Sequence, residues 1–295
     1  MKKPVFTGAG VAIITPMLPD GSVNYEELGR ILDDQIARHT DAIIICGTTG
    51  ESATLTHEEH IECIRYTVRK VAGRIPVVAG TGSNDTAFAI KLSRQAEEAG
   101  ADALLLVTPY YNKTTQAGLI AHYTAIANSV SLPCILYNVP SRTSMNLTPA
   151  TLAELSKIPN INAVKEASSD IVQIAEIAEL CGDNLNIYSG NDNQIVPILA
   201  LGGKGVISVL SNVAPEMAHD ICALWFDGKH EESLSLQMQV MGLVRALFKE
   251  SNPIPVKWAM NRLGWKAGGV RLPLVEASPA VQEMLETEMK RNGLL

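Results

Sequence analysis

Eight short apolar runs recur along the chain, and most are followed by a stretch with helical periodicity. The runs are apolar at successive positions rather than at every second one, which is typical of parallel strands buried on both faces. They occupy residues 11–15, 42–46, 77–79, 103–108, 134–138, 161–165, 185–189 and 205–209. The stretches between them predict amphipathic helices, as in the stripe formed by Leu28, Ile31, Leu32 and Ile36.

Eight consecutive strand–helix units fit either a closed barrel or a large open sheet. An open sheet that binds a dinucleotide is expected to carry the pattern GxGxxG after its first strand. Here that strand leads into Thr-Pro-Met at residues 15–17, and the nearest match, at residues 80–82, has Asp85 in place of the third glycine. We therefore predict an α/β fold, a (β/α)8 barrel of the TIM type, whose unit count is also eight.

The last part of the chain has a different pattern. No strand-like run follows Trp225, and the residues beyond it look helical or loop-like. A repeat at helical spacing is formed by Leu234, Met238, Met241, Val244 and Phe248. We therefore predict a catalytic barrel over residues 1–224 and a C-terminal helical extension over residues 225–295.

Two helix starts are marked by polar pairs. Asn24 with Glu27, and Thr56 with Glu59, have the three-residue spacing of a capping box. In that motif the first side chain accepts a hydrogen bond from the backbone N–H of the second residue, and the second side chain accepts one in return. The pattern predicts helices that begin just after residues 24 and 56.

Net charge and hydropathy narrow the class of partner. The 24 lysine and arginine residues are outnumbered by 31 aspartate and glutamate residues, which gives a net charge of −7, and no basic run is present. Such a chain lacks the electrostatic footprint of a nucleic-acid-binding protein. No apolar run reaches the roughly 18 residues of a membrane-spanning helix, and the N-terminus carries no secretory signal. We expect a cytoplasmic protein with neither a nucleic-acid nor a membrane partner.

Metal and disulfide chemistry are not expected. The five cysteines are odd in number, widely spaced and without a CxxC pair, which fits neither a disulfide framework nor a zinc site. Barrel enzymes place their active sites at the carboxyl ends of the strands. In this chain those ends offer hydroxyls, one arginine and one lysine, but no histidine pair or tight carboxylate cluster.

Lys165 is the most informative of these residues. It ends the strand-like run of residues 161–165, so the strand carries its amine to the mouth of the barrel. Loss of hydration there disfavours the ammonium form, and a neutral amine can attack a ketone to form a Schiff base. The alternative is a solvated lysine at a strand exit. Tyr137 ends the neighbouring strand, where its phenol either transfers a proton or caps the barrel core.

Three further segments offer groups that bind substrates. The turn that contains Thr48 and Thr49 combines hydroxyls with glycines, and its backbone amides suit a carboxylate, although an ordinary tight turn has the same composition. Arg142 follows a proline turn and either clamps a carboxylate bidentately or lies on the surface. Tyr110 and Tyr111 are adjacent aromatic residues on a loop, where packing or interface roles are the commoner ones.

Three sequence motifs together resemble a known family. They are GTTGES at residues 47–52, YNVPSRT at residues 137–143 and VKEA at residues 164–167. They are similar to the signatures of the dihydrodipicolinate synthases, which belong with N-acetylneuraminate lyase to the pyruvate-dependent class I aldolases. The resemblance extends over essentially the whole chain, including NPIPVK at residues 252–257.

The resemblance implies a reaction and its catalytic residues. Lys165 forms an imine with pyruvate, and the derived enamine attacks the aldehyde of aspartate 4-semialdehyde, the first committed step towards diaminopimelate and lysine. Tyr137 relays protons, together with Thr48 and with a Tyr111 that reaches in from a neighbouring subunit. The imine is the electron sink, so no cofactor is needed. The family typically forms a homotetramer, a dimer of tight dimers.

The resemblance also implies the residues that hold the two substrates. Thr49 and nearby amides hold the pyruvate carboxylate, with Ile207 in the lining of the pocket. Arg142 binds the carboxylate of aspartate semialdehyde. Gly190, at the end of another predicted strand, completes the expected substrate-binding set.

Lysine-inhibited members of the family bind L-lysine at the tight dimer interface, so the resemblance implies a candidate regulatory site. The matching positions are Ser52, Ala53, His57, His60, Asn84 and Tyr110. The acidic residue expected to hold the inhibitor's amine falls at Phe88, whose ring offers a cation–π contact but no carboxylate. The two histidines are spaced i, i+3 rather than i, i+4 as in HExxH, so no metal is expected there.

Two alternatives remain open from the sequence. One is a related pyruvate-dependent lyase that cleaves a sialic acid or a 2-keto-3-deoxy sugar acid. It would share Lys165 and Tyr137 and differ in the pocket for the second substrate. The other is a catalytically silent barrel that senses a keto acid, which the intact set of lysine, tyrosine, threonine and arginine disfavours. A turnover assay separates the two classes.

Overall fold

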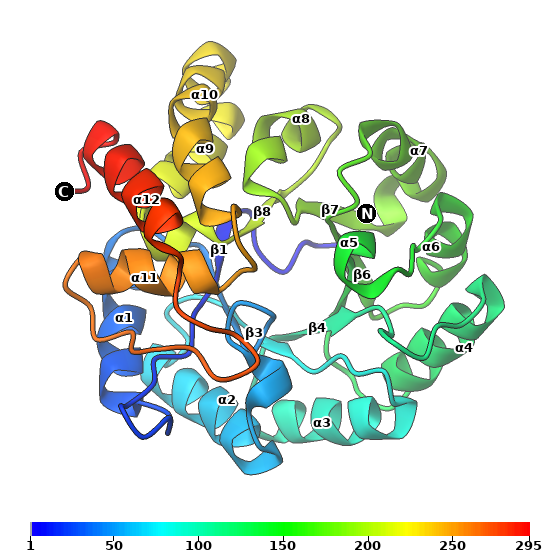
Figure 1. Cartoon of the computed structure of the whole chain (residues 1–295). Helices are drawn as coiled ribbons and strands as arrows, with labels where there is room; N and C mark the ends of the chain where they lie inside the picture. The colour runs from blue at the N-terminus through cyan, green and yellow to red at the C-terminus, as the bar shows by residue number, and fades with distance from the viewer. Residues whose placement is uncertain (1) are drawn as a thin grey trace.

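The eight strands close into one parallel barrel in the computed structural model, which describes residues 2–295 (Figure 1). The strands are β1 (Gly8–Ala12), β2 (Ala42–Ile45), β3 (Val77–Gly80), β4 (Ala103–Val107), β5 (Cys134–Asn138), β6 (Ile161–Glu166), β7 (Asn186–Ser189) and β8 (Gly205–Ser208). They pair in chain order, and β1 pairs with β8 to close the ring. The predicted (β/α)8 barrel is therefore confirmed.

Helices form an outer layer around the barrel (Figure 1). They are α1 (Tyr25–Ala37), α2 (His57–Val71), α3 (Thr86–Glu98), α4 (Gln116–Ala127), α6 (Pro149–Leu155), α7 (Ile171–Cys181), α8 (Ile195–Ala200) and α9 (Pro215–Phe226). A short helix, α5 (Pro140–Thr143), follows β5 directly. The predicted stripe on α1 faces the core, because Leu28, Ile31 and Leu32 are fully buried and Ile36 packs against them.

The first strand lies three residues earlier than the sequence pattern predicts, whereas the other seven agree to within one residue at each end. The apolar run indicated residues 11–15, but β1 is Gly8–Ala12. Glycine is required where β1 meets its neighbours, since a Cβ on Gly8 would collide with the carboxylate of Asp41. The close approach of Asp41 therefore requires glycine at position 8. Because glycine has a low strand propensity, the sequence pattern did not indicate that the strand begins there.

The two predicted capping boxes have different outcomes. Thr56 and Glu59 form the complete reciprocal box, with hydrogen bonds of 3.2 and 2.9 Å. Asn24 caps α1 by accepting from the backbone N–H of Glu27 at 3.1 Å, but Glu27 does not return the bond. Its carboxylate instead accepts from the backbone N–H of Lys266 at 2.7 Å. The capping box predicted at Asn24 is therefore only half formed, because the Glu27 carboxylate binds the C-terminal segment instead of the backbone N–H of Asn24.

The segment before β1 closes the amino-terminal end of the barrel. The ring of Phe6 stacks on that of Tyr188 inside the barrel, with centroids 4.4 Å apart. The amine of Lys2 donates hydrogen bonds of 2.6–2.8 Å to three backbone carbonyl oxygens, those of Ser156, Ile158 and Ile161. These contacts fill and brace the end of the barrel opposite the predicted active site.

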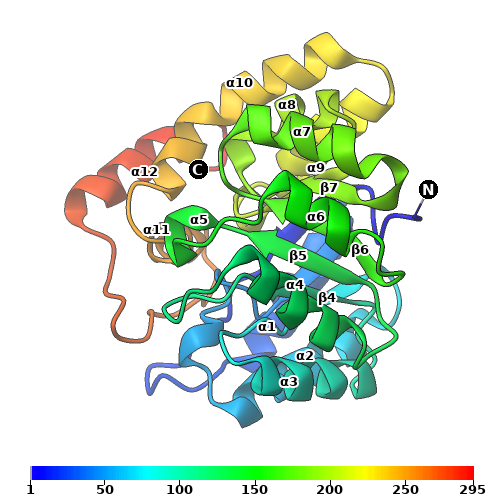
Figure 2. The same ribbon diagram turned by 90° about the vertical axis from the view of Figure 1, so that its right-hand side faces the viewer.

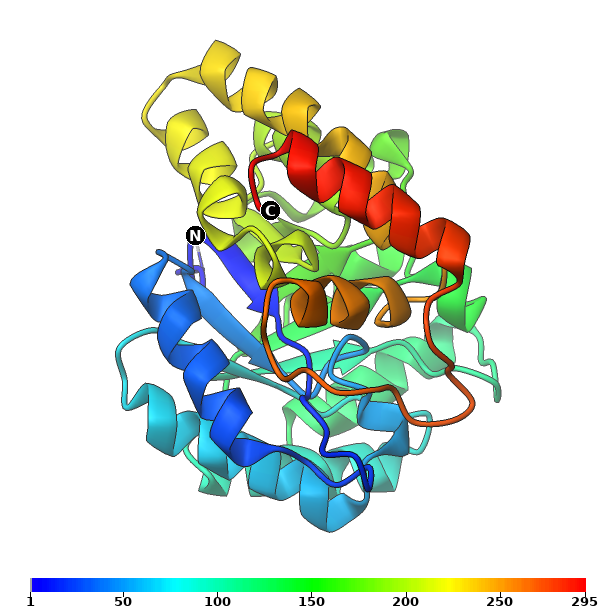
Figure 3. The same cartoon turned by 60° about the vertical axis from the view of Figure 1, so that its left-hand side comes forward.

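Three helices follow the barrel: α10 (His230–Leu247), α11 (Ile254–Arg262) and α12 (Pro279–Arg291). Figures 2 and 3 show α11 and α12 together on the side of the barrel where α5 also lies, which is the side of the carboxyl ends of the strands. The predicted helical repeat falls on α10 for four of its five residues, and Phe248 is the residue just after the helix. Leu234, Met238 and Phe248 are exposed rather than packed in the core. The buried face of α10 includes Gln237, whose amide donates to the carbonyl oxygen of Asp192 at 2.9 Å.

Two further features concern the membrane and the cysteines. Within residues 2–295, no helix combines the length and the apolar character needed to cross a membrane.

All five cysteines lie in the described part of the chain as buried free thiols. Burial raises the pKa of Cys46, which precedes the loop after β2, so this thiol is poorly suited to act as a nucleophile.

Candidate active site

A cavity of about 150 Å³ lies at the carboxyl ends of the strands, and we call it the inner cavity. Six of the predicted site residues line it: Thr48, Thr49, Tyr137, Arg142, Lys165 and Gly190. They come from β5, β6, α5 and the loops after β2 and β7. The barrel therefore gathers residues that are up to 142 positions apart (190 − 48) around one small space.

Lys165 is a buried amine beside an aromatic ring. It lies opposite Tyr137 in the pairing of β5 with β6, and its Nζ is 4.2 Å from the centroid of the tyrosine ring. Burial lowers the pKa of Lys165 to about 7; the negative charge of Asp192 opposes this shift, and the nearby Arg142 adds to it. A substantial share of the lysine is therefore neutral at neutral pH, as a nucleophilic amine requires.

Asp192 is a charged neighbour of Lys165 that the sequence reasoning did not single out. Its Oδ2 accepts from the backbone N–H groups of Val209 and Leu210 at 3.0 and 2.9 Å. Its buried Oδ1 has no hydrogen-bond partner among residues 2–295. Burial raises the pKa of Asp192, against the hydrogen bonds it accepts and the charge of Lys165. Its position three residues after the end of a predicted strand, in the loop at the catalytic end, was the available signal.

Tyr137 supplies a protonated phenol to the inner cavity. Burial raises its pKa, while the charge of Arg142 and a hydrogen bond with Thr48 oppose that effect. The phenol therefore holds its proton at neutral pH and can pass it to a substrate oxygen. Because the phenol, Thr48 and the amine of Lys165 line one cavity, a proton can move between them without crossing bulk solvent.

Gly190 makes room for the side chain of Lys165. A Cβ at this position would lie 2.8 Å from the Cβ of Ala167 and 3.2 Å from the Cε of Lys165. The backbone N–H of Gly190 donates to the carbonyl oxygen of Glu166 at 2.8 Å, which continues the pairing of β6 with β7 by one residue. A larger side chain here would displace the lysine from the cavity.

Asn252 links both predicted carboxylate-binding residues to the C-terminal extension. Its Nδ2 donates to the hydroxyl of Thr49 at 2.9 Å, and its carbonyl oxygen accepts from Nη2 of Arg142 at 3.2 Å. Asn252 lies between α10 and α11 and itself lines the inner cavity. The extension therefore contributes directly to the site, which the sequence analysis did not anticipate from spacing or composition.

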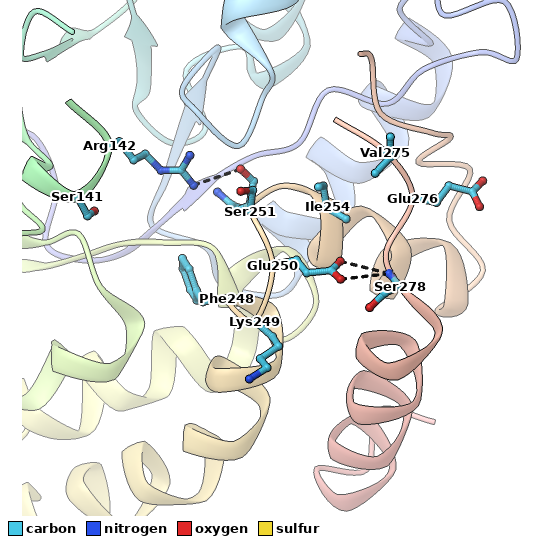
Figure 4. A pocket seen from close by; sticks show the side chains of 11 residues that line it. Ser141, Arg142, Phe248, Lys249, Glu250, Ser251, Ile254, Val275, Glu276 and Ser278 are labelled. Carbon is cyan, nitrogen blue, oxygen red and sulfur yellow. Dashed lines mark hydrogen bonds between the residues drawn. The ribbon is translucent and has the colours of Figure 1, made fainter. Parts of the chain in front are cut away.

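Arg142 also borders a larger groove that adjoins the inner cavity (Figure 4). The groove has a volume of about 920 Å³, and its lining includes Phe248, Lys249, Glu250 and the start of α12. Ser141, Arg142, Phe248 and Asn252 line both spaces. A second substrate that entered through this groove would meet the guanidinium of Arg142 before it reached Lys165.

Two of the predicted site residues do not reach the inner cavity. Ile207 is buried inside the barrel, where it packs in the same cluster as Tyr137, but it is not part of the cavity lining. Tyr111 is 93% exposed, has a left-handed backbone (φ 69°) and does not line the cavity of its own chain. Its ring therefore projects from the surface of the single subunit.

A second cavity of about 380 Å³ contains most of the candidate regulatory residues, and we call it the regulatory cavity. The predicted residues in its lining are Ser52, Ala53, His60, Phe88 and Tyr110. His57 and Asn84 lie beside it: the His57 ring centroid is 5.7 Å from that of Phe88, and Asn84 Nδ2 donates to the Tyr110 carbonyl at 3.1 Å. The structure therefore brings together all seven predicted positions.

The charged side chains in the lining of the regulatory cavity are those of Glu51 and Arg142. His60 is held by the carbonyl oxygen of Gly80, 2.7 Å from its Nε2, and burial lowers its pKa, so the ring is neutral. Phe88 presents an aromatic ring that is 39% exposed. No cluster of three histidine, cysteine, aspartate or glutamate side chains suited to a metal ion occurs in the part of the chain that the structure describes.

Comparison with known proteins gives full-length matches. A sequence model of the dihydrodipicolinate synthetase family matches residues 5–292. The 4-hydroxy-tetrahydrodipicolinate synthase of Lachnoclostridium phytofermentans is 57% identical over 292 residues, which cover 99% of each chain. That of Clostridium perfringens is 54% identical over 291 residues, covering 99% of this chain and 100% of the relative.

Solved structures agree with these sequence matches. A dihydrodipicolinate synthase from Acinetobacter baumannii, described as chloride-inhibited and complexed with pyruvate, superposes with a TM-score of 0.96 at 42% identity, covering 98% of this chain and 99% of that one. The enzyme from Cyanidioschyzon merolae with lysine bound gives a TM-score of 0.97 at 40% identity, covering 99% and 100%.

Proposed function

This chain belongs to the dihydrodipicolinate synthetase family, and we propose that its inner cavity condenses pyruvate with L-aspartate 4-semialdehyde to give 4-hydroxy-tetrahydrodipicolinate. This is the first committed step of diaminopimelate and lysine biosynthesis. The observation that carries the proposal is the buried amine of Lys165, with a pKa lowered to about 7, next to the phenol of Tyr137. The names of the full-length relatives favour this reaction over cleavage of a sugar acid or a silent sensor.

The reaction begins with attack of the neutral Lys165 amine on the keto carbon of pyruvate. The carbonyl oxygen leaves as water and an imine forms, and the positive imine then accepts the electron pair when a methyl proton is lost. The resulting enamine forms a carbon–carbon bond to the aldehyde carbon of the second substrate. The amino group of that substrate next attacks the imine carbon, which closes the ring and releases Lys165.

The remaining residues bind substrates and move protons. Tyr137 and Thr48 carry protons to and from the reacting oxygens, since both line the cavity and share a hydrogen bond. Thr49 and the loop amides hold the pyruvate carboxylate, and Gly190 keeps the space open. Arg142 binds the carboxylate of aspartate semialdehyde at the junction with the groove. Ile207 supports the floor of the site from inside the barrel.

We further propose a homotetramer built from tight dimers, with Tyr111 acting in the neighbouring subunit. Its 93% exposed ring and its absence from the cavity lining of its own chain support that role. Five buried free thiols suit a reducing compartment, so we place the protein in the cytoplasm. We also propose a division into a barrel of residues 1–224 and a helical extension of residues 225–295, with the boundary in the last turn of α9.

Borohydride reduction in the presence of pyruvate tests the central step. Reduction of the imine fixes the three-carbon unit on the lysine, and peptide mapping should find it on Lys165. Lys257 is an internal control, because it is a second buried lysine at the same end of the barrel. Absence of labelling, or labelling at Lys257 instead, would contradict the mechanism.

A further inference from the structure

A buried ion pair connects the C-terminal extension to the loop that carries Thr48 and Thr49. This loop spans residues 47–52, and both threonines line the inner cavity. Lys257 of α11 places its Nζ 2.8 Å from Oε1 of Glu51 in the loop, and both side chains are at most 2% exposed. A pair buried this deeply is sustained only when the remaining hydrogen-bonding groups of both partners are satisfied.

Both partners meet that condition. The Lys257 amine also donates to the carbonyl oxygens of Thr15, at 3.1 Å, and of Gly269, so its three hydrogens are all used. The other carboxylate oxygen of Glu51 accepts from the backbone N–H of Arg271 at 2.9 Å. The pair therefore joins the segment after β1, the loop after β2, α11 and the segment that follows α11.

The loop is held in a conformation that needs outside support. Glu51 has φ of 54°, in the left-handed region that residues with a Cβ rarely adopt. The carbonyl oxygen of Gly50 accepts from the hydroxyl of Thr15 at 2.7 Å, and the carbonyl of the same Thr15 binds Lys257. A strained backbone of this kind persists where the surrounding contacts determine it. The ion pair between Glu51 and Lys257 is one of those contacts.

We propose that Lys257 and Glu51 are positioning residues for the first substrate. Neither lines the inner cavity, so both act through the loop. Their ion pair fixes the backbone amides and hydroxyls that receive the pyruvate carboxylate, and the C-terminal extension thereby controls the affinity for the keto acid. This inference rests on the proposed function, because that function assigns the loop to pyruvate.

The test uses the full-length double variant Glu51→Gln/Lys257→Met, which removes both buried charges together and leaves neither unpaired. We expect the pyruvate concentration for half-maximal inactivation by borohydride to rise about ten- to hundredfold, the scale of effect that misplacing a binding group produces. The KM for aspartate semialdehyde should change much less, because Arg142 lies on α5 and not on the loop. Thermal denaturation of every variant is recorded alongside.

Lys2→Met is the matched control. It also removes a lysine whose amine has three oxygen partners, here three backbone carbonyls, but at the opposite end of the barrel. We expect it to lower the melting temperature without changing half-saturation by pyruvate. A rise of the same size in this control, or unchanged half-saturation in the double variant, would overturn the positioning role.

Two further outcomes separate this inference from its premise. If the unsubstituted protein is not labelled at Lys165, the proposed function fails and the positioning role fails with it. If the double variant does not fold, Glu51→Gln alone serves, because its amide oxygen can still accept from Lys257 while the negative charge is lost. A rise in the pyruvate requirement is then expected in the same direction, and its absence would refute the proposal.

Discussion

Lys165 and Lys257 are both buried at the same end of the barrel, but their surroundings differ. Lys257 has three oxygen partners, including the Glu51 carboxylate at 2.8 Å. The Nζ of Lys165 is 4.2 Å from the centroid of the Tyr137 ring, and the charge of Asp192 opposes the effect of burial on the pKa of this amine. Burial lowers the pKa of both amines, but at Lys257 the charge and hydrogen bond of Glu51 oppose it directly.

The comparison teaches that burial alone does not identify a nucleophile. An ammonium ion surrounded by oxygens keeps its proton and serves as a structural link. A buried amine whose desolvation is opposed only by a nearby carboxylate, as Asp192 opposes it at Lys165, loses its proton more readily, and its pKa falls to about 7. The chemistry of each lysine therefore follows from its partners, and substitutions can test the two surroundings separately.

The largest expected effect is the loss of catalysis on removal of the Lys165 amine. Lys165→Ala should lower turnover by at least about a thousandfold, as removal of a covalent nucleophile does in other enzymes. Circular dichroism should show an intact barrel, because the side chain makes no ion pair that the fold requires. The coupled condensation assay measures the loss, and activity above one tenth of the unsubstituted level would remove Lys165 from the covalent step.

The next largest expected effect is on the free energy of unfolding, which should respond differently to substitution of the two lysines. Lys257→Met leaves the Glu51 carboxylate buried without its partner, and the free energy of unfolding should fall by about 3–5 kcal/mol. Lys165→Met makes the same chemical change where the ammonium ion is poorly satisfied, so the free energy of unfolding should stay the same or rise. Urea denaturation at pH 7 and fixed protein concentration measures both, and equal losses would break the comparison.

Substitution of Arg142 tests whether its positive charge, which lies near Lys165, binds the carboxylate of aspartate semialdehyde. A charge-assisted contact with a carboxylate is worth about 1.5–3 kcal/mol, so Arg142→Ala should raise the KM for aspartate semialdehyde by about 10- to 100-fold. Formation of the pyruvate imine should change much less. Lys249→Ala is the control, because it removes another positive charge from the same groove. Equal losses for both substrates would mark Arg142 as a structural residue.

The pH dependence of imine formation follows from the pKa of Lys165, which burial lowers to about 7. Only the neutral amine attacks, so the single-turnover rate with pyruvate should rise about tenfold per pH unit below that pKa and level off above it. The charge of Asp192 raises the pKa of Lys165. Asp192→Asn should therefore move the inflection to lower pH, and an unmoved inflection would argue against this electrostatic coupling.

The same shift has a consequence for stability with a definite sign. The pKa of Lys165 is lower in the folded protein, at about 7, than the roughly 10.4 of a lysine in an unfolded chain. The unfolded state therefore binds more protons between these values, and this group makes stability rise with pH in that window, by up to about 1.4 kcal/mol per unit. Lys165→Met should lack that part of the rise.

The fold could be predicted because strand burial is a local signal. Each strand of a parallel barrel is covered on both faces, so its residues are apolar in succession, and seven strands were located to within one residue. The exception, β1, begins at Gly8 and also contains Gly10, where a Cβ would lie 2.8 Å from Phe6 Cζ. Glycine is needed at these two positions because other parts of the chain pack closely against them. A local sequence pattern does not report such contacts.

The site was predictable where its residues lie near the carboxyl ends of strands or in the segments that follow them. Lys165 and Tyr137 are next to last in β6 and β5, and the inner cavity brings them together with the predicted Thr48, Thr49, Arg142 and Gly190. The contacts of Asn252 with Thr49 and of Lys257 with Glu51 join residues 203 and 206 positions apart. Periodicity, capping and composition act over a few residues, so they carry no signal for such pairs. The motif at residues 252–257 indicated the family and not the contact.

The smallest expected effect is inhibition by a free amino acid. The surroundings of its ammonium group in the regulatory cavity can be compared with those of Lys165 and Lys257. In the regulatory cavity, an amino acid would meet the ring of Phe88, which is 39% exposed. The neutral His60 adds no negative charge, and the carboxylate of Glu51 in that lining is already engaged by Lys257 and the backbone of Arg271. The cavity therefore offers an ammonium ion an environment closer to that of Lys165 than to that of Lys257.

The energetics of that contact predict weak regulation by L-lysine. An exposed cation–π contact gives about 0.5–1 kcal/mol, whereas a tenfold change in affinity requires about 1.4 kcal/mol. L-Lysine should therefore inhibit weakly or not at all, and Phe88→Glu should make the enzyme more sensitive by supplying the carboxylate. Phe88→Leu is the control, since it removes the ring without adding charge and should leave inhibition no stronger. Steady-state rates across a lysine titration measure all three proteins. Submillimolar inhibition of the unsubstituted enzyme would show that the other residues of the cavity suffice, and that an ammonium ion can be held there without the oxygen partners that Lys257 requires.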